Sequence, residues 1–298
     1  MEQRVIDILV LNQIDFRQNE NVSHYSTFKV GGVAAVAVFP KNRQELISVL
    51  KIFFQNGVRT EVIGNASNML FAFDYFDGAM IFTCGLSNIS VDGQSIYAES
   101  GSSLTYLSQI AAKKSLSGLE FAYGIPGLVG GSVYMNAGAY GSQISAVLEY
   151  SDAYDCERDE VVRIYDHRFG YRKSIYMSRP ELICLGASFS LNKGEENEIM
   201  AKMRENMESR KKNQPLEFPS GGSYFKRPEG YFAGKLIEDC GLKGMRVGAA
   251  EVSEKHAGFI VNRGGATWQD VLCLEEKIKE IVMSRFGVLL EREVRLIK

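Results

Sequence analysis

The chain has 298 residues, which is enough for one large domain or two to three small ones with sizeable hydrophobic cores. Its 34 Lys and Arg nearly balance its 36 Asp and Glu, so no overall charge favours nucleic acid or an anionic membrane, and a small-molecule ligand is expected. Five scattered cysteines without a Cys-x-x-Cys pair fit a reducing compartment, and three dispersed histidines lack metal-ligand spacing, so we expect no metal.

The N-terminal segment does not have the pattern of a secretory signal. Residues 1–16 place charged residues such as Glu2 and Arg4 among apolar ones, instead of a basic start before an apolar run. The most apolar segment, 30–39, has ten residues, whereas a helix needs roughly 20 to span a bilayer. We therefore expect a cytoplasmic protein with no membrane insertion and no nucleic-acid partner.

A strand, helix and strand are expected in the first part of the chain. Val- and Ala-rich residues 30–39 predict a strand, after which Asn42 and Glu45 form a plausible capping box for a helix. Gly57 ends the helix, and residues 61–63 return to an extended apolar pattern. The apolar residues at helical spacing are Leu46, Val49, Leu50, Phe53 and Phe54.

Short strands and helices alternate through the rest of the chain, so the predicted fold class is α+β. A helix is expected after Gly101, with Leu104, Leu107, Ile110 and Ala111 on its apolar face. Further strands are expected at residues 79–83, 87–91, 95–99, 147–154, 161–164 and 182–191.

A change in composition at residues 194–198 marks the expected domain boundary. We expect residues 1–194 to form one domain, with subdomains of about 1–84 and 85–194, and residues 195–298 to form a second. In the second, Ile199, Met203 and Met207 with Met200 form one apolar helix face, and Thr267 and Gly287 bound a long helix. A strand over residues 288–297 completes the chain and could pack back on the first domain.

The first loop that could bind a ligand follows the strand expected at residues 61–63. Its sequence is Gly64-Asn65-Ala66-Ser67-Asn68. Small and amide residues in succession can turn their backbone N–H groups towards an anion. The same residues also dominate ordinary turns, and the pattern alone leaves both interpretations open.

A second loop, between Gly124 and Gly141, holds six glycines in 18 residues where the overall composition predicts about two. Glycine lets the main chain approach a pyrophosphate or a ring system closely, and it costs conformational entropy. The chain contains no Gly-x-Gly-x-x-Gly fingerprint and no phosphate-binding Gly-Lys-Ser/Thr, so a dinucleotide site would be of another type. A tight surface loop is the alternative.

The order of several motifs resembles the UDP-N-acetylenolpyruvoylglucosamine reductase family, whose members are FAD-dependent enzymes of peptidoglycan precursor synthesis. The resemblance covers almost the whole chain. Its motifs are Tyr25-Ser26-Thr27-Phe28-Lys29-Val30-Gly31-Gly32, Gly64-Asn65-Ala66-Ser67-Asn68, Ile125-Pro126-Gly127 with Asn136-Ala137-Gly138-Ala139-Tyr140-Gly141, Phe169-Gly170-Tyr171-Arg172-Lys173-Ser174, Gly221-Gly222-Ser223-Tyr224-Phe225-Lys226 and Leu290-Glu291-Arg292-Glu293-Val294.

The resemblance implies a two-part FAD-binding domain of the vanillyl-alcohol-oxidase type and a C-terminal α+β substrate-binding domain. It further implies non-covalent FAD, NADPH as co-substrate, and a UDP-sugar whose enolpyruvyl group takes a hydride at the β-carbon and a proton at the α-carbon. A monomer is expected. The cofactor-binding residues that it implies are Gly64, Asn65, Ala66, Ser67, Asn68, Gly124, Ile125, Pro126, Gly127, Gly130, Gly131, Ser132, Asn136, Gly138 and Ala139.

The resemblance also implies three catalytic residues. Ser223 corresponds to the proton donor, and the glycines before it would let its hydroxyl approach the substrate. Arg172 and Glu293 would act on the substrate carboxylate, Arg172 by charge-assisted hydrogen bonds and Glu293 as an acid or polarising group. Tyr224, Lys226 and Arg227 are implied substrate-binding residues, with Lys226 and Arg227 near the diphosphate.

The sequence departs from the family in two places. Arg227 stands where asparagine is common, which leaves its role open. The short link 192–198 has no room for the loop with a substrate-clamping tyrosine that longer members carry, so the chain resembles the shorter type.

Patterns alone leave other interpretations of these residues open. Ser223 could be a turn serine, and Glu293 could lie on the solvated face of a strand. A sugar or alcohol oxidase of the same flavin fold, with His24 as a conceivable flavin tether, and a non-enzymatic nucleotide-binding module are the alternative functions. Neither accounts for Ser223, Arg172 and Glu293 together.

Overall fold

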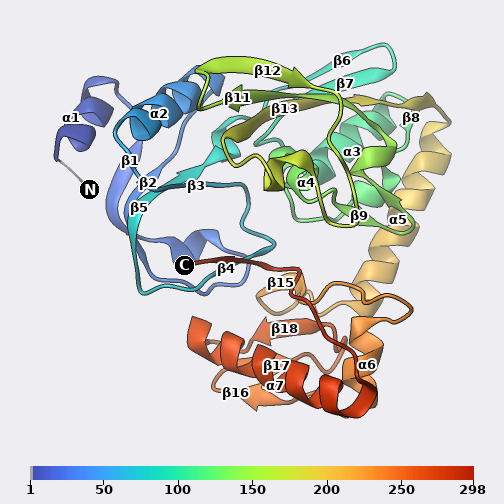
Figure 1. The fold of residues 1–298 in the computed structure, drawn as a ribbon. Helices are drawn as coiled ribbons and strands as arrows, with labels where there is room; N and C mark the ends of the chain where they lie inside the picture. Colours follow the sequence, from blue (N-terminus) through green and yellow to red (C-terminus); the bar gives the residue numbers. More distant parts are fainter. Residues whose placement is uncertain (1–2) are drawn as a thin grey trace. The chain divides into compact units, whose positions relative to one another are not determined.

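The computed structural model describes residues 3–298 and divides into two compact units (Figure 1). Within the described residues, unit 1 holds residues 3–18, 35–65 and 77–209, and unit 2 holds residues 19–34, 66–76 and 210–298. These units are defined by contacts between residues, whereas the predicted domains 1–194 and 195–298 are defined by the ligand that each binds. The predicted division therefore stays a prediction. Each unit is described by itself.

A four-stranded sheet in the order β1-β2-β5-β3 forms the N-terminal part of the fold. Its strands are β1 (Phe16–Asn21), β2 (Val33–Val38), β3 (Thr60–Ile63) and β5 (Tyr75–Phe82), with β3 parallel to β5. Helix α2 (Arg43–Gln55) begins at Asn42, whose side chain accepts a hydrogen bond from the Glu45 amide, as the capping pattern predicts. The buried face of α2 packs in one core with that of α1 (Gln3–Leu11).

An antiparallel five-stranded sheet, in the order β12-β11-β13-β7-β6, completes unit 1. Helices α3 (Leu104–Lys113) and α4 (Val129–Tyr134) cover one of its faces (Figure 1). The strands are β6 (Ile89–Asp92), β7 (Ser95–Glu99), β11 (Leu148–Asp155), β12 (Glu160–Ile164) and β13 (Leu182–Ser190). The strands and the helix predicted in this region are therefore confirmed, with boundaries shifted by one or two residues.

Short elements connect these layers. The small strands are β8 (Leu116–Ser117), β9 (Gly138–Ala139), β10 (Ser142–Gln143) and β14 (Asn192–Lys193), and the 3₁₀ helices are η1 (Val22–Tyr25), η2 (Thr83–Gly85), η3 (Glu120–Ala122), η4 (Ile144–Ala146) and η5 (Ile175–Met177). Helix α5 (Glu196–Asn213) follows and buries Ile199, Met203 and Asn206.

Unit 2 is built on an antiparallel sheet in the order β15-β18-β17-β16. Its strands are β15 (Ser220–Ser223), β16 (Arg246–Val247), β17 (Ala250–Val252) and β18 (Phe259–Asn262). Helices α6 (Ala233–Asp239) and α7 (Trp268–Phe286) share a hydrophobic core with this sheet, and α7 runs along it (Figure 1). Thr267 and Asp270 form a full capping box for α7, and Gly287 ends it in the left-handed conformation, as predicted.

The predicted final strand over residues 288–297 is wrong for most of its length. Only β19 (Arg295–Ile297) is a strand, and it pairs in parallel with β4 (Met69–Phe71). Before it, the chain makes a single isolated bridge, between Arg292 and Phe225. Residues 291–293 make two backbone hydrogen bonds with residues 224–226, and the chain then pairs with β4 instead. This change of partner prevents a continuous ladder.

Candidate active site

The predicted site residues fall into two sets. Unit 1 holds Gly64, Asn65, the loop 124–141 and Arg172, and unit 2 holds residues 66–68, 223–227 and Glu293. Within each unit the fold brings the predicted residues together across long stretches of sequence.

In unit 1 the two predicted cofactor loops touch. The Asn65 side-chain amide donates a 2.7 Å hydrogen bond to the carbonyl oxygen of Pro126. The segment 100–105 holds the second loop from its other side, because the amide of Leu104 donates to Gly127 and the amide of Gly124 donates to the Thr105 hydroxyl. Ile125 packs against the core beneath. The pattern of small residues thus marks one continuous surface of backbone.

The glycines of this surface serve different purposes. A Cβ at Gly130 would lie 2.9 Å from the Cβ of Ser100, and a Cβ at Gly138 would lie 2.5 Å from the Ser142 carbonyl oxygen, so close packing requires both glycines. A Cβ at Gly131 would meet nothing within 4 Å, and one at Gly64 would make only ordinary contact with Leu128. Packing within the protein therefore does not explain Gly64 and Gly131.

These observations fit a cofactor that lies against the backbone here. Gly131 is exposed at the first turn of α4. Beside the preceding Gly130, Ser100 is buried and its hydroxyl has no hydrogen-bond partner within residues 3–298, which is unusual for a buried polar group. Ser132, by contrast, is buried and bonds the Leu128 carbonyl, so its hydroxyl is used inside the helix.

Arg172 lies on the segment 169–174 and contacts the second predicted loop. Its guanidinium donates to the carbonyl oxygens of Gly138 at 3.1 Å and Asn136 at 3.5 Å. Asn136 is fully buried, and its side chain donates to Gly170 and accepts from the Ser145 amide, so it braces the Arg172 turn rather than presenting its amide to a ligand. Arg172 and Asn136 both have left-handed backbones, with φ of 53° and 44°. Strained backbone of this kind is found preferentially at functional sites.

Ala139 and the residues after it form a tight hairpin. Strands β9 and β10 pair Ala139 with Ser142, and the two turn residues, Tyr140 and Gly141, have φ of 53° and 83°. Two successive positive values are the signature of a type I′ turn. The hairpin fixes the carbonyl of Gly138 that receives Arg172.

A buried hydrogen-bond chain anchors the other end of the Arg172 loop. His167 Nε2 lies 2.7 Å from the Ser151 hydroxyl, which lies 2.7 Å from the hydroxyl of Tyr176, and His167 Nδ1 faces the Tyr165 carbonyl at 3.2 Å. Burial lowers the pKa of His167. A neutral ring with its proton on Nδ1 satisfies every member of this chain.

In unit 2, Ser223 is exposed at the end of β15, where it pairs with Phe259. Gly222 before it has φ of 80° and open space around its Cα, so the turn that presents the hydroxyl favours glycine. Gly221 is buried, and a Cβ there would lie 3.1 Å from Val294. The glycines therefore bring the C-terminal segment close to the serine.

Glu293 lies on that segment, directly beside the serine turn. Its backbone amide donates to the carbonyl of Tyr224 at 2.9 Å, and its carbonyl accepts from the Asn68 side chain at 3.2 Å. Ser67 and Asn68 are half-buried, and Ala66 has a left-handed φ of 45° with its carbonyl facing the Thr27 hydroxyl. The sequence-distant residues Ser223, Glu293 and Asn68 are thus neighbours in one unit.

Tyr224 requires a correction. Its ring is fully buried and its hydroxyl donates to Glu275 at 2.8 Å, so the side chain is part of the core and is not available to a substrate. Burial raises its pKa further above the ordinary value. Tyr224 follows exposed Ser223, and Phe225 after it is also buried, so the chain turns into the core here and the motif match did not reveal it.

The two basic residues after Tyr224 lie at the surface. Lys226 Nζ pairs with Glu291 at 3.1 Å, and the Lys226 amide donates to the Glu291 carbonyl. The Arg227 guanidinium lies over the ring of Phe232 at 4.4 Å. Arg227 therefore makes a cation–π contact, which a neutral asparagine at this position could not make.

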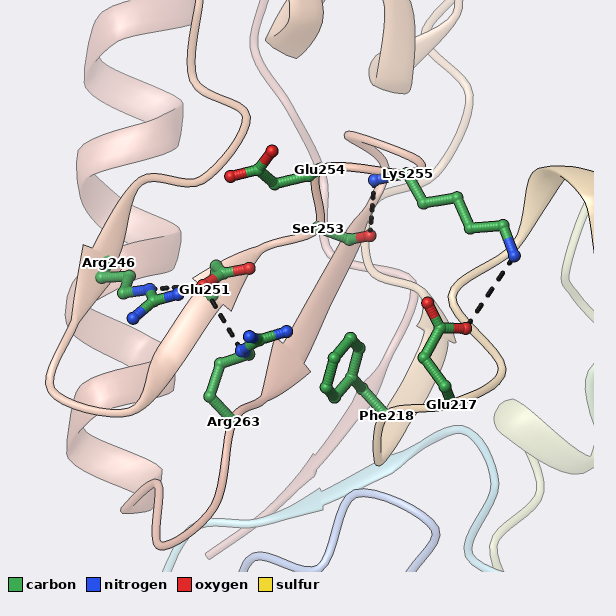
Figure 2. Close-up of a pocket in the computed structure, with 8 residues that line it drawn as sticks. All are labelled: Glu217, Phe218, Arg246, Glu251, Ser253, Glu254, Lys255 and Arg263. Carbon is green, nitrogen blue, oxygen red and sulfur yellow. Dashed lines mark hydrogen bonds and ion pairs between the residues drawn. The ribbon is translucent and has the colours of Figure 1, made fainter.

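A cavity of about 270 Å³ elsewhere in unit 2 contains none of the predicted residues (Figure 2). Three acidic and three basic side chains line it, and most of them pair: buried Glu251 is held by Arg246 and by Arg263 at 3.6 Å, and Lys255 faces Glu217 at 3.9 Å. This internal neutralisation leaves no net charge for a ligand.

The described residues also bear on metals and membranes. No group of three or more His, Cys, Asp or Glu side chains within residues 3–298 is arranged to hold a metal ion. None of the helices described is both long and apolar enough to cross a membrane. His24 is exposed in η1.

Two residues that the structure singles out, Ser100 and Glu275, were not identified from the sequence. Ser100 gave no signal, because a single serine after a strand is common. Glu275 gave one that could have been used: it lies four residues after Val271 and three before Ile278, and this spacing places it on the apolar face of α7. A carboxylate on an apolar face needs buried partners.

Comparison with known proteins places the chain in a family. A model of an FAD binding domain matches residues 34–164, and a model of the UDP-N-acetylenolpyruvoylglucosamine reductase C-terminal domain matches residues 214–297. In a crystal structure of UDP-N-acetylenolpyruvylglucosamine reductase (MurB) from Thermus caldophilus, a chain 32% identical superposes with a TM-score of 0.80, covering 96% of this chain and 99% of that one.

More distant structures share the fold alone. Phl p 4.0202, a glucose dehydrogenase, and a berberine bridge enzyme variant, a reticuline dehydrogenase, each give a TM-score of 0.50 over 64% of this chain and 44% of theirs, at 16% and 12% identity. The predicted α+β fold with an FAD-binding domain of the vanillyl-alcohol-oxidase type is confirmed.

Relatives of known name match over the full length. UDP-N-acetylenolpyruvoylglucosamine reductase of Caldanaerobacter subterraneus subsp. tengcongensis is 42% identical over 100% of this chain and 99% of its own, and that of Streptococcus pneumoniae strain Hungary19A-6 is 44% identical over 97% and 96%. The chain is an FAD-dependent oxidoreductase, and it belongs to the UDP-N-acetylenolpyruvoylglucosamine reductase family.

Proposed function

We propose that the protein uses NADPH to reduce the enolpyruvyl group of UDP-N-acetylglucosamine enolpyruvate, yielding UDP-N-acetylmuramate for peptidoglycan precursor synthesis and cell-wall biogenesis. The observation that carries the residue assignment is the placement of Ser223 and Glu293 on two adjoining segments of unit 2. Two residues 70 positions apart, each implied by its own motif, become neighbours there.

The backbone surface of unit 1 would hold the cofactor. Gly64 and Gly131 would allow it to approach the main chain, Asn65 and Pro126 join the two loops beneath it, and the unpaired Ser100 hydroxyl offers a polar contact. Non-covalently bound FAD would supply the redox chemistry, since it would carry a hydride from NADPH to the β-carbon of the substrate. The remaining chemistry is assigned to side chains.

Ser223 would deliver the proton to the substrate α-carbon. A serine hydroxyl is a weak acid, so it can act only on a strongly basic, enolate-like carbon and only when held within reach. The exposed position of Ser223 and the absence of a side chain at Gly222 support that approach. Its proton is then replaced from solvent.

Arg172 and Glu293 would bind the substrate carboxylate as it gains negative charge. The Arg172 guanidinium is held on two backbone carbonyls, which fixes its orientation in advance. Glu293 is half-buried, and as an acid or polarising group it would stabilise the same charge. Lys226 and Arg227 supply positive charge for the diphosphate of the UDP-sugar.

We further infer that the protein acts in the cytoplasm as a monomer. All five cysteines are free, as is usual in a reducing compartment. Size-exclusion chromatography with light scattering would test the monomer: a mass near 33.2 kDa agrees with it, and twice that mass contradicts it.

Anaerobic visible spectroscopy tests the function. The absorbance of bound oxidised flavin should fall on addition of NADPH and return on addition of UDP-N-acetylglucosamine enolpyruvate. A protein whose reduced flavin is reoxidised by oxygen but not by this substrate would be an oxidase, and the proposed reaction would be wrong.

A further inference from the structure

Glu275 is a buried carboxylate on the apolar face of α7, and it does not belong to any predicted site. It is fully buried. One of its oxygens, Oε2, accepts hydrogen bonds from the hydroxyl of Tyr224 at 2.8 Å and from Nε of Arg292 at 2.7 Å. The other, Oε1, lies 2.5 Å from Nζ of Lys279.

The two groups that share Oε2 are the sequence neighbours of the proposed catalytic residues. Tyr224 follows Ser223, and Arg292 precedes Glu293. The Glu293 amide donates to the Tyr224 carbonyl, so Glu275 joins the same two segments a second time through their side chains. A single carboxylate oxygen thus spans the segments that carry the proton donor and the carboxylate-binding residue.

This second connection has a purpose that the backbone does not fulfil. The segment before β19 makes only one isolated bridge to its neighbour, between Phe225 and Arg292. Short pairings without a ladder specify register weakly. The shared oxygen of Glu275 fixes Tyr224 and Arg292 relative to one another, and therefore fixes the register of Ser223 against Glu293.

The charges of the cluster favour an ionised Glu275. Burial pushes the pKa of Glu275 upwards, but hydrogen bonds from Arg292 and Lys279 outweigh it and hold the pKa below its ordinary value. An ionised carboxylate can accept both bonds at Oε2, whereas a neutral amide oxygen accepts them more weakly.

We propose that Glu275 is a positioning residue that sets the placement of Ser223 relative to Glu293 for protonation of the reduced substrate. This inference rests on the proposed function. Glu275 touches neither substrate nor cofactor, and it acts through Tyr224 and Arg292. Displacement of a reacting group by 1 Å can cost about 100-fold in rate, so small shifts of register have measurable effects.

The test separates the two half-reactions of the FAD-loaded enzyme by stopped-flow spectroscopy. Glu275→Gln should slow flavin reoxidation by UDP-N-acetylglucosamine enolpyruvate about tenfold or more, and should leave flavin reduction by NADPH within about twofold. Tyr224→Phe removes one of the two bonds to Oε2 while retaining the ring in the core, and should slow reoxidation about threefold to tenfold. Tyr224→Phe provides the test if Glu275→Gln does not fold.

The matched control is Glu251→Gln in the cluster of Figure 2. Glu251 is also buried in unit 2 and also paired with two basic side chains, but these are Arg246 and Arg263 rather than Arg292. It should change both half-reactions equally or not at all. Equal loss of reduction and reoxidation in the Glu275 and Tyr224 variants, or unchanged reoxidation in both, would overturn the proposal. A wild-type enzyme whose flavin this substrate does not reoxidise would instead refute the proposed function.

Discussion

The side-chain amide of Asn68 donates a 3.2 Å hydrogen bond to the carbonyl oxygen of Glu293, and the amide of Arg295 donates to the Asn68 carbonyl at 2.9 Å. Asn68 and Glu293 are 225 positions apart in the sequence. One belongs to the loop predicted to bind cofactor and the other to the segment predicted to act on the substrate. The fold thus joins these two tasks within unit 2 through direct hydrogen bonds.

The first prediction concerns Glu293. Glu293→Gln should lower kcat for the UDP-sugar by about 10²- to 10³-fold, because the variant loses a group that stabilises developing charge on the substrate. Glu291→Gln, two residues away at an exposed Lys226 pair, should change kcat less than about twofold. Steady-state kinetics with NADPH compare the two. Similar losses in both would assign the effect to the segment rather than to Glu293.

The second prediction concerns Arg172. Arg172→Lys should reduce kcat/KM for the enolpyruvyl substrate about 100-fold, since an ammonium cannot hold two backbone carbonyls and a carboxylate with the same fixed geometry. Arg168→Lys is the control, because Arg168 lies on the same loop with a similar left-handed φ of 48° and is exposed. An Arg168 effect as large as that of Arg172 would contradict the proposed role.

The third prediction uses two adjacent glycines. Gly130→Ala should destabilise the protein by about 1–3 kcal/mol, because its Cβ would lie 2.9 Å from that of Ser100. Gly131→Ala should preserve or slightly raise stability, since its Cβ meets open space, but should weaken FAD binding about tenfold or more. Urea unfolding of the apoprotein and titration with FAD measure the two effects. Unaltered FAD affinity in Gly131→Ala would remove this residue from the cofactor surface.

The fourth prediction is a pH dependence that originates at His167. Its folded-state pKa is lowered from an ordinary value of 6.5, so below about pH 6.5 the unfolded chain binds a proton that the folded chain rejects. The contribution is fully present above pH 6.5 and is lost as the pH falls from there through the folded pKa. The slope is at most about 1.4 kcal/mol per pH unit.

His167→Gln should therefore flatten the fall in unfolding free energy between pH 7 and pH 5. The glutamine can still accept from Ser151, but it does not titrate. Urea unfolding of wild type and variant at the two pH values provides the measurement. Parallel curves for the two proteins would show that His167 makes no contribution to this slope.

Much of the fold could be predicted from local patterns. The cap at Asn42, the capping box at Thr267 and the stop at Gly287 all determine backbone geometry within a few residues, and the structure has each of them. The end of the chain could not be predicted in this way, because residues 288–294 alternate like a strand but change partners. Pairing depends on sequence-distant segments, which periodicity does not identify.

The site divides along the same line. The motif resemblance supplied the identity of Ser223, Arg172 and Glu293, and spacing alone did not. The same resemblance misassigned the Tyr224 side chain, and it did not separate Gly130, which is required by packing, from Gly131, which is not. These distinctions depend on which atoms lie opposite a residue, and only the folded chain provides that information.

The rate of flavin reoxidation in Ser223→Ala tests the central claim most directly. In anaerobic stopped-flow experiments with FAD-loaded enzyme, reduction by NADPH should remain within about twofold of wild type, because Ser223 takes no part in it. Reoxidation by UDP-N-acetylglucosamine enolpyruvate should slow by about 10²- to 10⁴-fold, the usual contribution of a positioned acid. Reoxidation at the wild-type rate in Ser223→Ala would contradict the account, since the proton would then come from another group.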